Sequence, residues 1–208
     1  MSQFIESIKI EDQEVFLLEL HQKRVNDTFA HFGAQGSINL EKIVKNLEID
    51  EDGFFKLRIV YDLERNYKTQ LIPYAIAEID NFQLVENNTY DYTFKFEDRK
   101  EFEKMKTKAK CEEIIIVKNN YITDTSYTNL LFLKDEIWYT PTTYLLNGVM
   151  RQHLLKEKKI KETEITLQNI KEFSHFQLIN SMNDFDDMFI YPIERIVNLP
   201  ESREYLGI

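Results

Sequence analysis

Residues 91–99 read DYTFKFEDR and residues 122–132 read ITDTSYTNLLF, and these two stretches decide how the chain is interpreted. In the first stretch, Lys95 stands between Phe94 and Phe96, where a strand would bury or half-bury its side chain. A low-dielectric environment disfavours the ammonium form, so such a lysine can act as a nucleophile and a base near neutral pH. The alternative is a lysine on the solvent face of an edge strand, and this stretch taken alone favours that alternative.

The sequence around these stretches alternates between strand-like and helix-like patterns, which predicts an α+β fold. A half-buried strand is expected at residues 4–10, a helix at 20–32 that Gly33 stops, and a short helix at 40–47. Turn-prone pairs at 119–120 and 135–136 join the strands of a meander. The other expected strands are 54–63, 71–79, 82–87, 112–119, 120–124, 128–135, 136–141 and 188–193, and the other expected helices are 95–110 and 148–155. We therefore predict two lobes, residues 1–88 and 89–208, with a linker near residues 85–94.

Five motifs stand in a fixed order along the chain. LELHQKRV (18–25) holds His21 and Arg24 in an H-x-x-R pattern, and Lys95 is followed by Asp98 and Arg99. In ITDTSYTNLLF, Thr123, Asp124 and Asn129 match a T-(E/D)-x-x-x-x-N-(L/I)-F pattern. IWYTP (137–141) precedes LLNGVMRQHLL (145–155). In this order and spacing the chain resembles the fold-type IV pyridoxal-phosphate enzymes. These are the class IV aminotransferases, including branched-chain and D-amino-acid aminotransferases, and the 4-amino-4-deoxychorismate lyases.

The resemblance implies a role for the two central residues. Lys95 would form the Schiff base with pyridoxal 5'-phosphate and then act as the proton-transfer base. Asp124 would face the pyridine nitrogen and keep it protonated, so that the ring can accept electrons from the substrate. Lys95 is therefore the expected catalytic residue.

The cofactor phosphate needs backbone amides and a cation. LLNGVMR places a glycine directly before an expected helix, whose free N–H groups can receive an anion. By resemblance, Gly148 and the amides of Val149 and Met150 would hold the phosphate, while Leu146 packs against the ring. Arg24 would add a charged fork. Ser181, in LINSMND (178–184), is a looser match to a second phosphate contact.

Two reactions compete within this resemblance. A lyase would convert 4-amino-4-deoxychorismate to pyruvate and 4-aminobenzoate, a folate precursor, whereas a transaminase would act on a branched-chain or D-amino acid. GVMRQ and the compact length favour the lyase. The family usually begins with an extra strand and a G-D-x-x-F-E-T segment, of which only the end is matched, by residues 4–7, so an N-terminally shortened fold is expected. A relative that binds a partner or the cofactor without turnover is the third alternative.

Composition limits the partners and the compartment. With 36 acidic and 26 basic residues the formal net charge is -10, which opposes binding to nucleic acid or to an anionic membrane. The single cysteine, Cys111, cannot form an internal disulfide, and neither a signal peptide nor an apolar span is evident. We expect a cytoplasmic enzyme with a small-molecule amino substrate and no metal, and by resemblance a homodimer.

Overall fold

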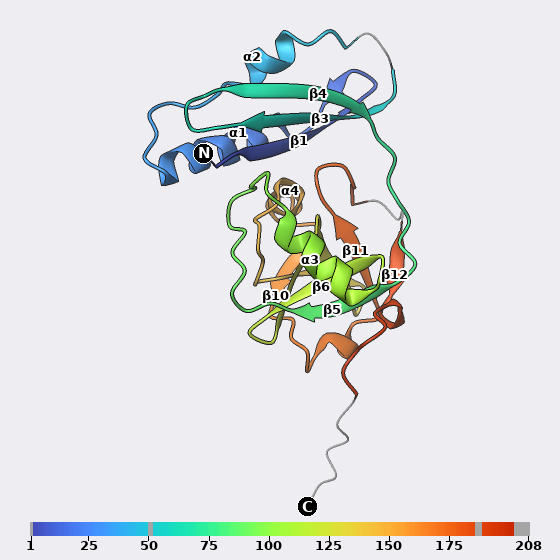
Figure 1. The fold of residues 1–208 in the computed structure, drawn as a ribbon. Coiled ribbons are helices and arrows are strands. Elements are labelled where there is room, and N and C mark those ends of the chain that lie inside the picture. The colour runs from blue at the N-terminus through green and yellow to red at the C-terminus, as the bar shows by residue number, and fades with distance from the viewer. Residues whose placement is uncertain (1, 50–51, 186–188, 202–208) are drawn as a thin grey trace, which may run out of the picture.

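The structure is a computed structural model that describes residues 2–49, 52–185 and 189–201. The chain folds into two lobes, each built on its own sheet, with the first lobe above the second in Figure 1. The expected α+β class is therefore confirmed.

The first lobe holds a four-stranded sheet in the order β2-β1-β3-β4, with two helices. Its elements are β1 (Phe4–Glu11), β2 (Glu14–Val15), α1 (Leu18–His31), α2 (Leu40–Lys45), β3 (Phe54–Tyr61) and β4 (Tyr67–Pro73). The paired strands are antiparallel. Alternate residues of β1, such as Phe4 and Ile8, pack with Val25 and Phe29 of α1 in one apolar core. The alternating apolar residues of the strand and the apolar face of the helix therefore pack against each other, as their two spacings predict.

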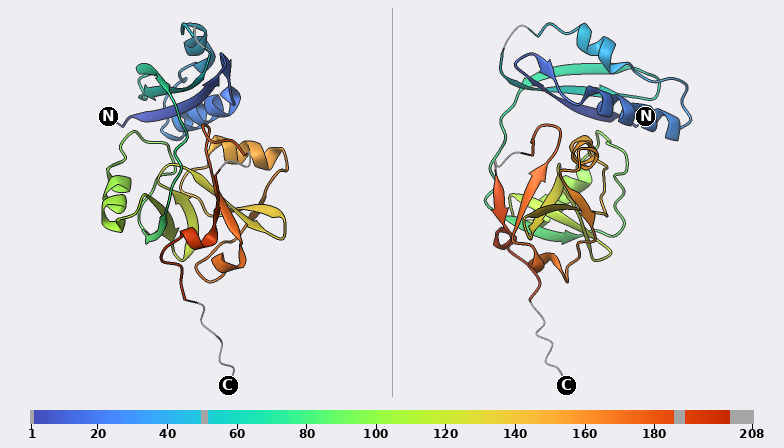
Figure 2. Two further views of the ribbon diagram at one scale, coloured as in Figure 1. Left: turned by 90° about the vertical axis from the view of Figure 1, so that its right-hand side faces the viewer. Right: turned by 180° about the vertical axis from the view of Figure 1, so that it is seen from behind.

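The second lobe holds an eight-stranded sheet in which β8 pairs with β7, β9 and β11. Its strands are β5 (Phe82–Glu86), β6 (Glu113–Lys118), β7 (Tyr121–Thr125), β8 (Asn129–Lys134), β9 (Ile137–Pro141), β10 (Lys161–Thr163), β11 (His175–Ile179) and β12 (Ile190–Pro192). Its helices are α3 (Lys100–Ala109), α4 (Val149–Lys156) and the short 3-10 turns η1 (Ile170–Glu172) and η2 (Ile193–Arg195). Figure 2 shows these strands curving around a shared interior.

The two tight turns of the meander follow from residue type. Asn119 and Asn120, between β6 and β7, both have positive φ, as do Asp135 and Glu136 between β8 and β9. Two consecutive residues with positive φ match the twist of a two-residue hairpin. The turns predicted at these positions are confirmed.

Three differences from the expected boundaries change how the two lobes are connected. The helix expected from Lys95 begins at Lys100, because residues 95–97 bond to the first lobe instead: Ile5 N donates to Lys95 O (2.9 Å) and Glu97 N donates to Gln3 O (2.8 Å). The strand expected at residues 71–79 ends at Pro73, and the chain then crosses to the second lobe. β5, which precedes the expected boundary at residue 88, pairs with β6 and so belongs to the second sheet. Residue 188 of the last expected strand lies outside the described residues.

No helix in the described part of the chain is long and apolar enough to cross a bilayer.

Candidate active site

A cavity of about 370 Å³ lies between the two lobes and receives side chains from both. Seven of the eight residues that the sequence singled out line it: Arg24, Lys95, Asp124, Leu146, Gly148, Val149 and Ser181. The eighth, Met150, buries its side chain in the core beneath α4. Its expected contribution is its amide, which lies in the first turn of α4.

Lys95 lies in an irregular segment that runs beside β1. Phe4 and Phe96 form an isolated antiparallel bridge, and Phe94 and Phe96 pack against the first lobe's core. Burial, followed by the charge of Arg24, lowers the pKa of Lys95 from 10.5 to about 7. A large fraction of its amine is therefore unprotonated at neutral pH, as a lysine nucleophile requires.

Asp124 is buried on β7, with an exposed fraction of 5%. Its Oδ2 accepts hydrogen bonds from Leu145 N and Leu146 N, both 2.9 Å long, and its Oδ1 accepts one from Asn129 Nδ2 (2.8 Å). Burial raises the pKa of this carboxyl to about 6, and the three donors offset part of that rise. Near pH 7 the site therefore holds a mostly ionised carboxylate.

Asn129 and Gly148 fix the loop in front of α4. Asn129 Nδ2 also donates to Leu146 O (2.8 Å), so one amide group connects Asp124 with the loop. A Cβ atom at position 148 would lie 2.0 Å from Asn129 Oδ1. Gly148 has φ -64°, which any residue can adopt, so it is close packing that requires glycine here. Asn129 is part of a sequence motif, but no pattern in the sequence indicated this contact.

The N-terminus of α4 opens on the cavity at Gly148 and Val149. Amides in the first turn of a helix have no partner within the helix, and the helix dipole adds positive potential there. This end of α4 is therefore suited to an anion such as a phosphate.

Arg24 forms an ion pair with a buried carboxylate, that of Glu6. Its Nε donates to Glu6 Oε1 (2.8 Å), and its Nη2 contacts Glu6 Oε2. His21 Nδ1 lies 2.6 Å from the same Oε2, and the Glu6 side chain is fully buried. Burial alone would raise the pKa of Glu6, but Arg24 and His21 lower it to about 2. Glu6 was not singled out from the sequence, because an acidic residue in a short strand is usually exposed.

Comparison with known proteins identifies the family. The family model for amino-transferase class IV matches residues 3–196. The chain belongs to this family. It is an enzyme of a pyridoxal-phosphate-dependent class, with the fold-type IV architecture expected from its motifs.

Individual proteins are similar to this chain over most of its length. A protein of known structure from Haemophilus somnus 129pt, proposed to be a 4-amino-4-deoxychorismate lyase, is 30% identical and superposes with a TM-score of 0.81 over 89% of this chain and 98% of its own. An uncharacterised protein from Haemophilus influenzae is 29% identical over 187 residues, which are 88% of this chain and 99% of its own. The branched-chain amino acid aminotransferase of Escherichia coli is 15% identical and shares the fold, with a TM-score of 0.73 over 95% of this chain and 78% of its own.

In this class IV aminotransferase chain, Ser181 and Asp184 of the second lobe both contact β1. Ser181 Oγ donates a hydrogen bond to Ser7 O (2.6 Å), which connects the second lobe to β1 of the first lobe. Lys9, also on β1, forms an ion pair with Asp184 (2.5 Å). Ser181 lines the cavity as expected, and this lobe-to-lobe bond is a second role that the sequence did not indicate.

More basic than acidic side chains line the cavity, although the whole chain is acidic. Five basic side chains face the carboxylates of Glu97 and Asp124: Arg24, Lys56, Arg58, Lys95 and Arg99. Arg58 pairs with Glu97 (2.7 Å). Arg24 pairs with Glu6 and Lys95 is only partly protonated near pH 7, so Lys56 and Arg99 contribute the positive charge that favours an anionic ligand.

Proposed function

We propose that this chain is a pyridoxal-phosphate-dependent lyase that converts 4-amino-4-deoxychorismate to 4-aminobenzoate and pyruvate, a step that supplies a folate precursor. The observation that carries the proposal is the convergence of Lys95 and Asp124 on one cavity, in a chain that is 30% identical to a protein proposed to be such a lyase. The lowered pKa of Lys95 leaves much of its amine unprotonated near pH 7, and Asp124 stays mostly ionised there although burial raises its pKa to about 6.

The residues present fit the cofactor. Lys95 would bind its aldehyde, Asp124 would face its ring nitrogen, and the N-terminus of α4 would receive its phosphate. Only glycine fits at position 148, which brings the backbone itself to the cavity wall. Arg24, paired with Glu6, would face the cofactor from the side of the first lobe. When bound, pyridoxal phosphate supplies an electron sink for the pair of electrons left when a substrate proton departs.

The chain's own groups would manage protons and orientation. Lys95, with a pKa of about 7, can take the proton from the amine-bearing carbon of the substrate and can return a proton at neutral pH. Elimination of the enolpyruvyl group then gives pyruvate and an aromatic ring. Asp124 holds a negative charge opposite the ring nitrogen because Leu145 N, Leu146 N and Asn129 Nδ2 fix its two oxygens. The cations of the cavity would bind the carboxylates of the substrate.

The test compares wild type, Lys95→Ala and a control, Lys100→Ala, whose side chain is 85% exposed. With pyridoxal phosphate, wild type and Lys100→Ala should develop a visible absorbance band, and borohydride should fix a pyridoxyl group on Lys95. With aminodeoxychorismate, both should release pyruvate and fluorescent 4-aminobenzoate, and Lys95→Ala should not. A band without these products would replace the lyase by an aminotransferase, and the absence of any Lys95-dependent band would refute the enzymatic proposal.

We also propose that the enzyme forms a homodimer, as the resemblance of its motifs to the family implies. Light scattering of the purified protein tests this directly, because a monomeric mass near the 25.0 kDa of the chain would contradict it.

A further inference from the structure

Glu113 is a buried acid that the proposed reaction does not use. It begins β6, its side chain is fully buried, and it is not among the residues that line the cavity. A buried carboxylate is costly unless it is paired and hydrogen-bonded. Its contacts therefore indicate what it stabilises.

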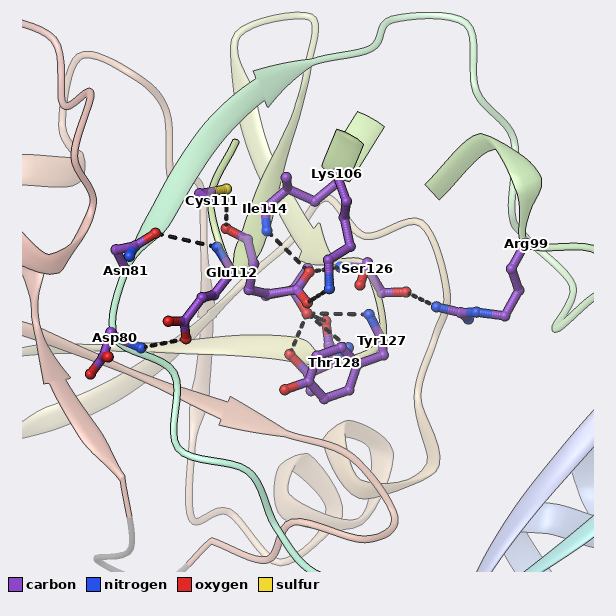
Figure 3. Close-up of polar contacts among 12 residues, drawn as sticks. Asp80, Asn81, Arg99, Lys106, Cys111, Glu112, Ile114, Ser126, Tyr127 and Thr128 are labelled. Carbon is purple, nitrogen blue, oxygen red and sulfur yellow. Dashed lines mark hydrogen bonds and ion pairs between the residues drawn. The ribbon is translucent and has the colours of Figure 1, made fainter. Parts of the chain in front are cut away.

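Three donors from three segments converge on this carboxylate. Ser126 N donates to Oε1 (2.9 Å), Ile114 N donates to the same oxygen (3.1 Å), and Lys106 Nζ of α3 donates to Oε2 (2.9 Å). Figure 3 shows Lys106 and Ser126 approaching the same point from different elements. Ser126 belongs to the turn between β7 and β8. The Glu113 side chain therefore binds the backbone of this turn.

Several other bonds of the turn are made among its own residues, and Arg99 and Asn180 donate to it from outside, to Ser126 O and Tyr127 O. Thr125 Oγ1 accepts from Thr128 N (3.0 Å) and Tyr127 N (3.3 Å) and lies 2.7 Å from Thr128 Oγ1. Thr125 pairs with Ile115 of β6 in the sheet, and the bond from Ser126 N to Glu113 extends this attachment beyond the end of β7 into the turn. All four residues, 125–128, line the cavity.

The other side of Ser126 connects to the segment of Lys95. Ser126 O accepts a hydrogen bond from Arg99 Nη2 (2.6 Å), as Figure 3 shows. Arg99 follows Lys95 by four residues, and Ser126 follows Asp124 by two. The peptide groups around Ser126 thus lie between the segments that carry the two central groups of the site.

We infer that Glu113 is a positioning residue: by anchoring Ser126 it sets the place of Asp124 relative to Lys95. This inference rests on the proposed function, since it assigns Glu113 a part in the geometry of that same site. The carboxylate acts through the turn and touches neither substrate nor cofactor.

The test uses Glu113→Ala and Glu113→Gln with a matched control, Glu112→Ala. Glu112 is the neighbouring acid, but it is exposed, and its carboxylate accepts from Asp80 N (2.9 Å), on the side away from the turn in Figure 3. Amide hydrogen exchange is followed at Tyr127 and Thr128, which bond to Thr125, and at Leu145 and Leu146, which bond to Asp124. None of these four amides bonds to Glu113 itself. The first pair therefore reports the order of the turn, and the second pair reports the position of the Asp124 carboxylate.

Glu113→Ala should speed exchange at these four amides by about tenfold or more, while Glu112→Ala should leave them unchanged. Glu113→Gln should lie between wild type and Glu113→Ala, because its amide oxygen can still accept from Ser126 N. If Glu113→Ala does not fold, Glu113→Gln is compared with Glu112→Gln, and an increase of about fivefold is expected only in the former. Wild-type exchange rates at the four amides in a folded Glu113 variant, or an equal increase in the Glu112 control, would overturn the inference.

Turnover gives a second readout. In Glu113→Ala, kcat should fall by between about tenfold and about 100-fold, as expected for a displaced reacting group, and Glu113→Gln should recover most of it. An unchanged kcat in Glu113→Ala would overturn the inference. Amide exchange is measured without cofactor, so it tests the positioning role of Glu113 whether or not the enzyme is a lyase. The proposed function is tested separately by the Lys95-dependent absorbance and products of the wild type, so the two failures are distinguishable.

Discussion

Gly148→Ala should destabilise the protein far more than a single methyl group ordinarily does. The new Cβ would lie 2.0 Å from Asn129 Oδ1, so the buried Asn129 side chain must move. Moving it breaks its bonds to the Asp124 carboxylate and to Leu146 O. Overpacking and the two lost hydrogen bonds together cost roughly 3 to 7 kcal/mol. For a chain of this length that corresponds to a fall of roughly 10–20 °C in Tm.

A double-mutant cycle measures whether this contact is the cause. Asn129→Ala removes the oxygen that the Cβ would meet, so adding Gly148→Ala to it should cost less than about 1 kcal/mol. Gly33→Ala is the control: its φ of +67° is strained for alanine but nothing lies within 4 Å, and a cost of about 1 kcal/mol is expected. The reasoning is refuted if Gly148→Ala melts within about 2 °C of wild type, or if its cost is the same with and without Asn129.

Three further predictions concern the titratable groups. Because burial and then Arg24 lower the pKa of Lys95 to about 7, the rate of its reaction with pyridoxal should rise with pH to a midpoint near 7, and a midpoint near 10.5 in stopped-flow absorbance would contradict this. Burial raises the pKa of Asp124 from 3.8 to about 6, so the folded state keeps a proton that the unfolded chain loses. The stabilisation from this group is full below pH 3.8 and falls by about 3 kcal/mol in all as the pH rises through 6. The difference in urea-unfolding free energy between wild type and Asp124→Asn should therefore change by about 2.4 kcal/mol between pH 4 and 7. Glu6→Gln removes the buried anion shared by Arg24 and His21 and should cost about 3–5 kcal/mol in urea unfolding at pH 7, whereas a cost below about 1 kcal/mol would mean that the cluster is not held by its charge.

Sequence patterns predicted the features that depend on neighbouring residues. The Asn119-Asn120 turn and the strands around it follow from local φ preferences and alternation. Lys95 and Asp124 were brought to one site by family motifs, and both line the cavity. Amino-acid composition and hydrophobic periodicity alone would not have predicted that these two residues, which lie on separate elements, share a site.

The contacts that the sequence did not predict are those made between distant segments. Glu6 and Arg24 are 18 residues apart, and nothing in the H-x-x-R pattern shows that the arginine is paired inside the fold. The helix expected from Lys95 starts later because backbone bonds to β1 outweigh local helix propensity. Tertiary hydrogen bonds decided both cases, and such bonds leave no periodic signal in the sequence.

The same contacts explain why Lys95 has a low pKa. Its chain segment leads into the second lobe, yet Lys95 O bonds to Ile5 N of β1, so the first lobe holds the lysine in place. Arg24, the second cause of the lowered pKa, also comes from the first lobe, whereas Asp124 belongs to the second. The two central groups are therefore attached to different lobes. Their relative position depends on the contacts that bridge the lobes, such as the bond from Ser181 to Ser7 O.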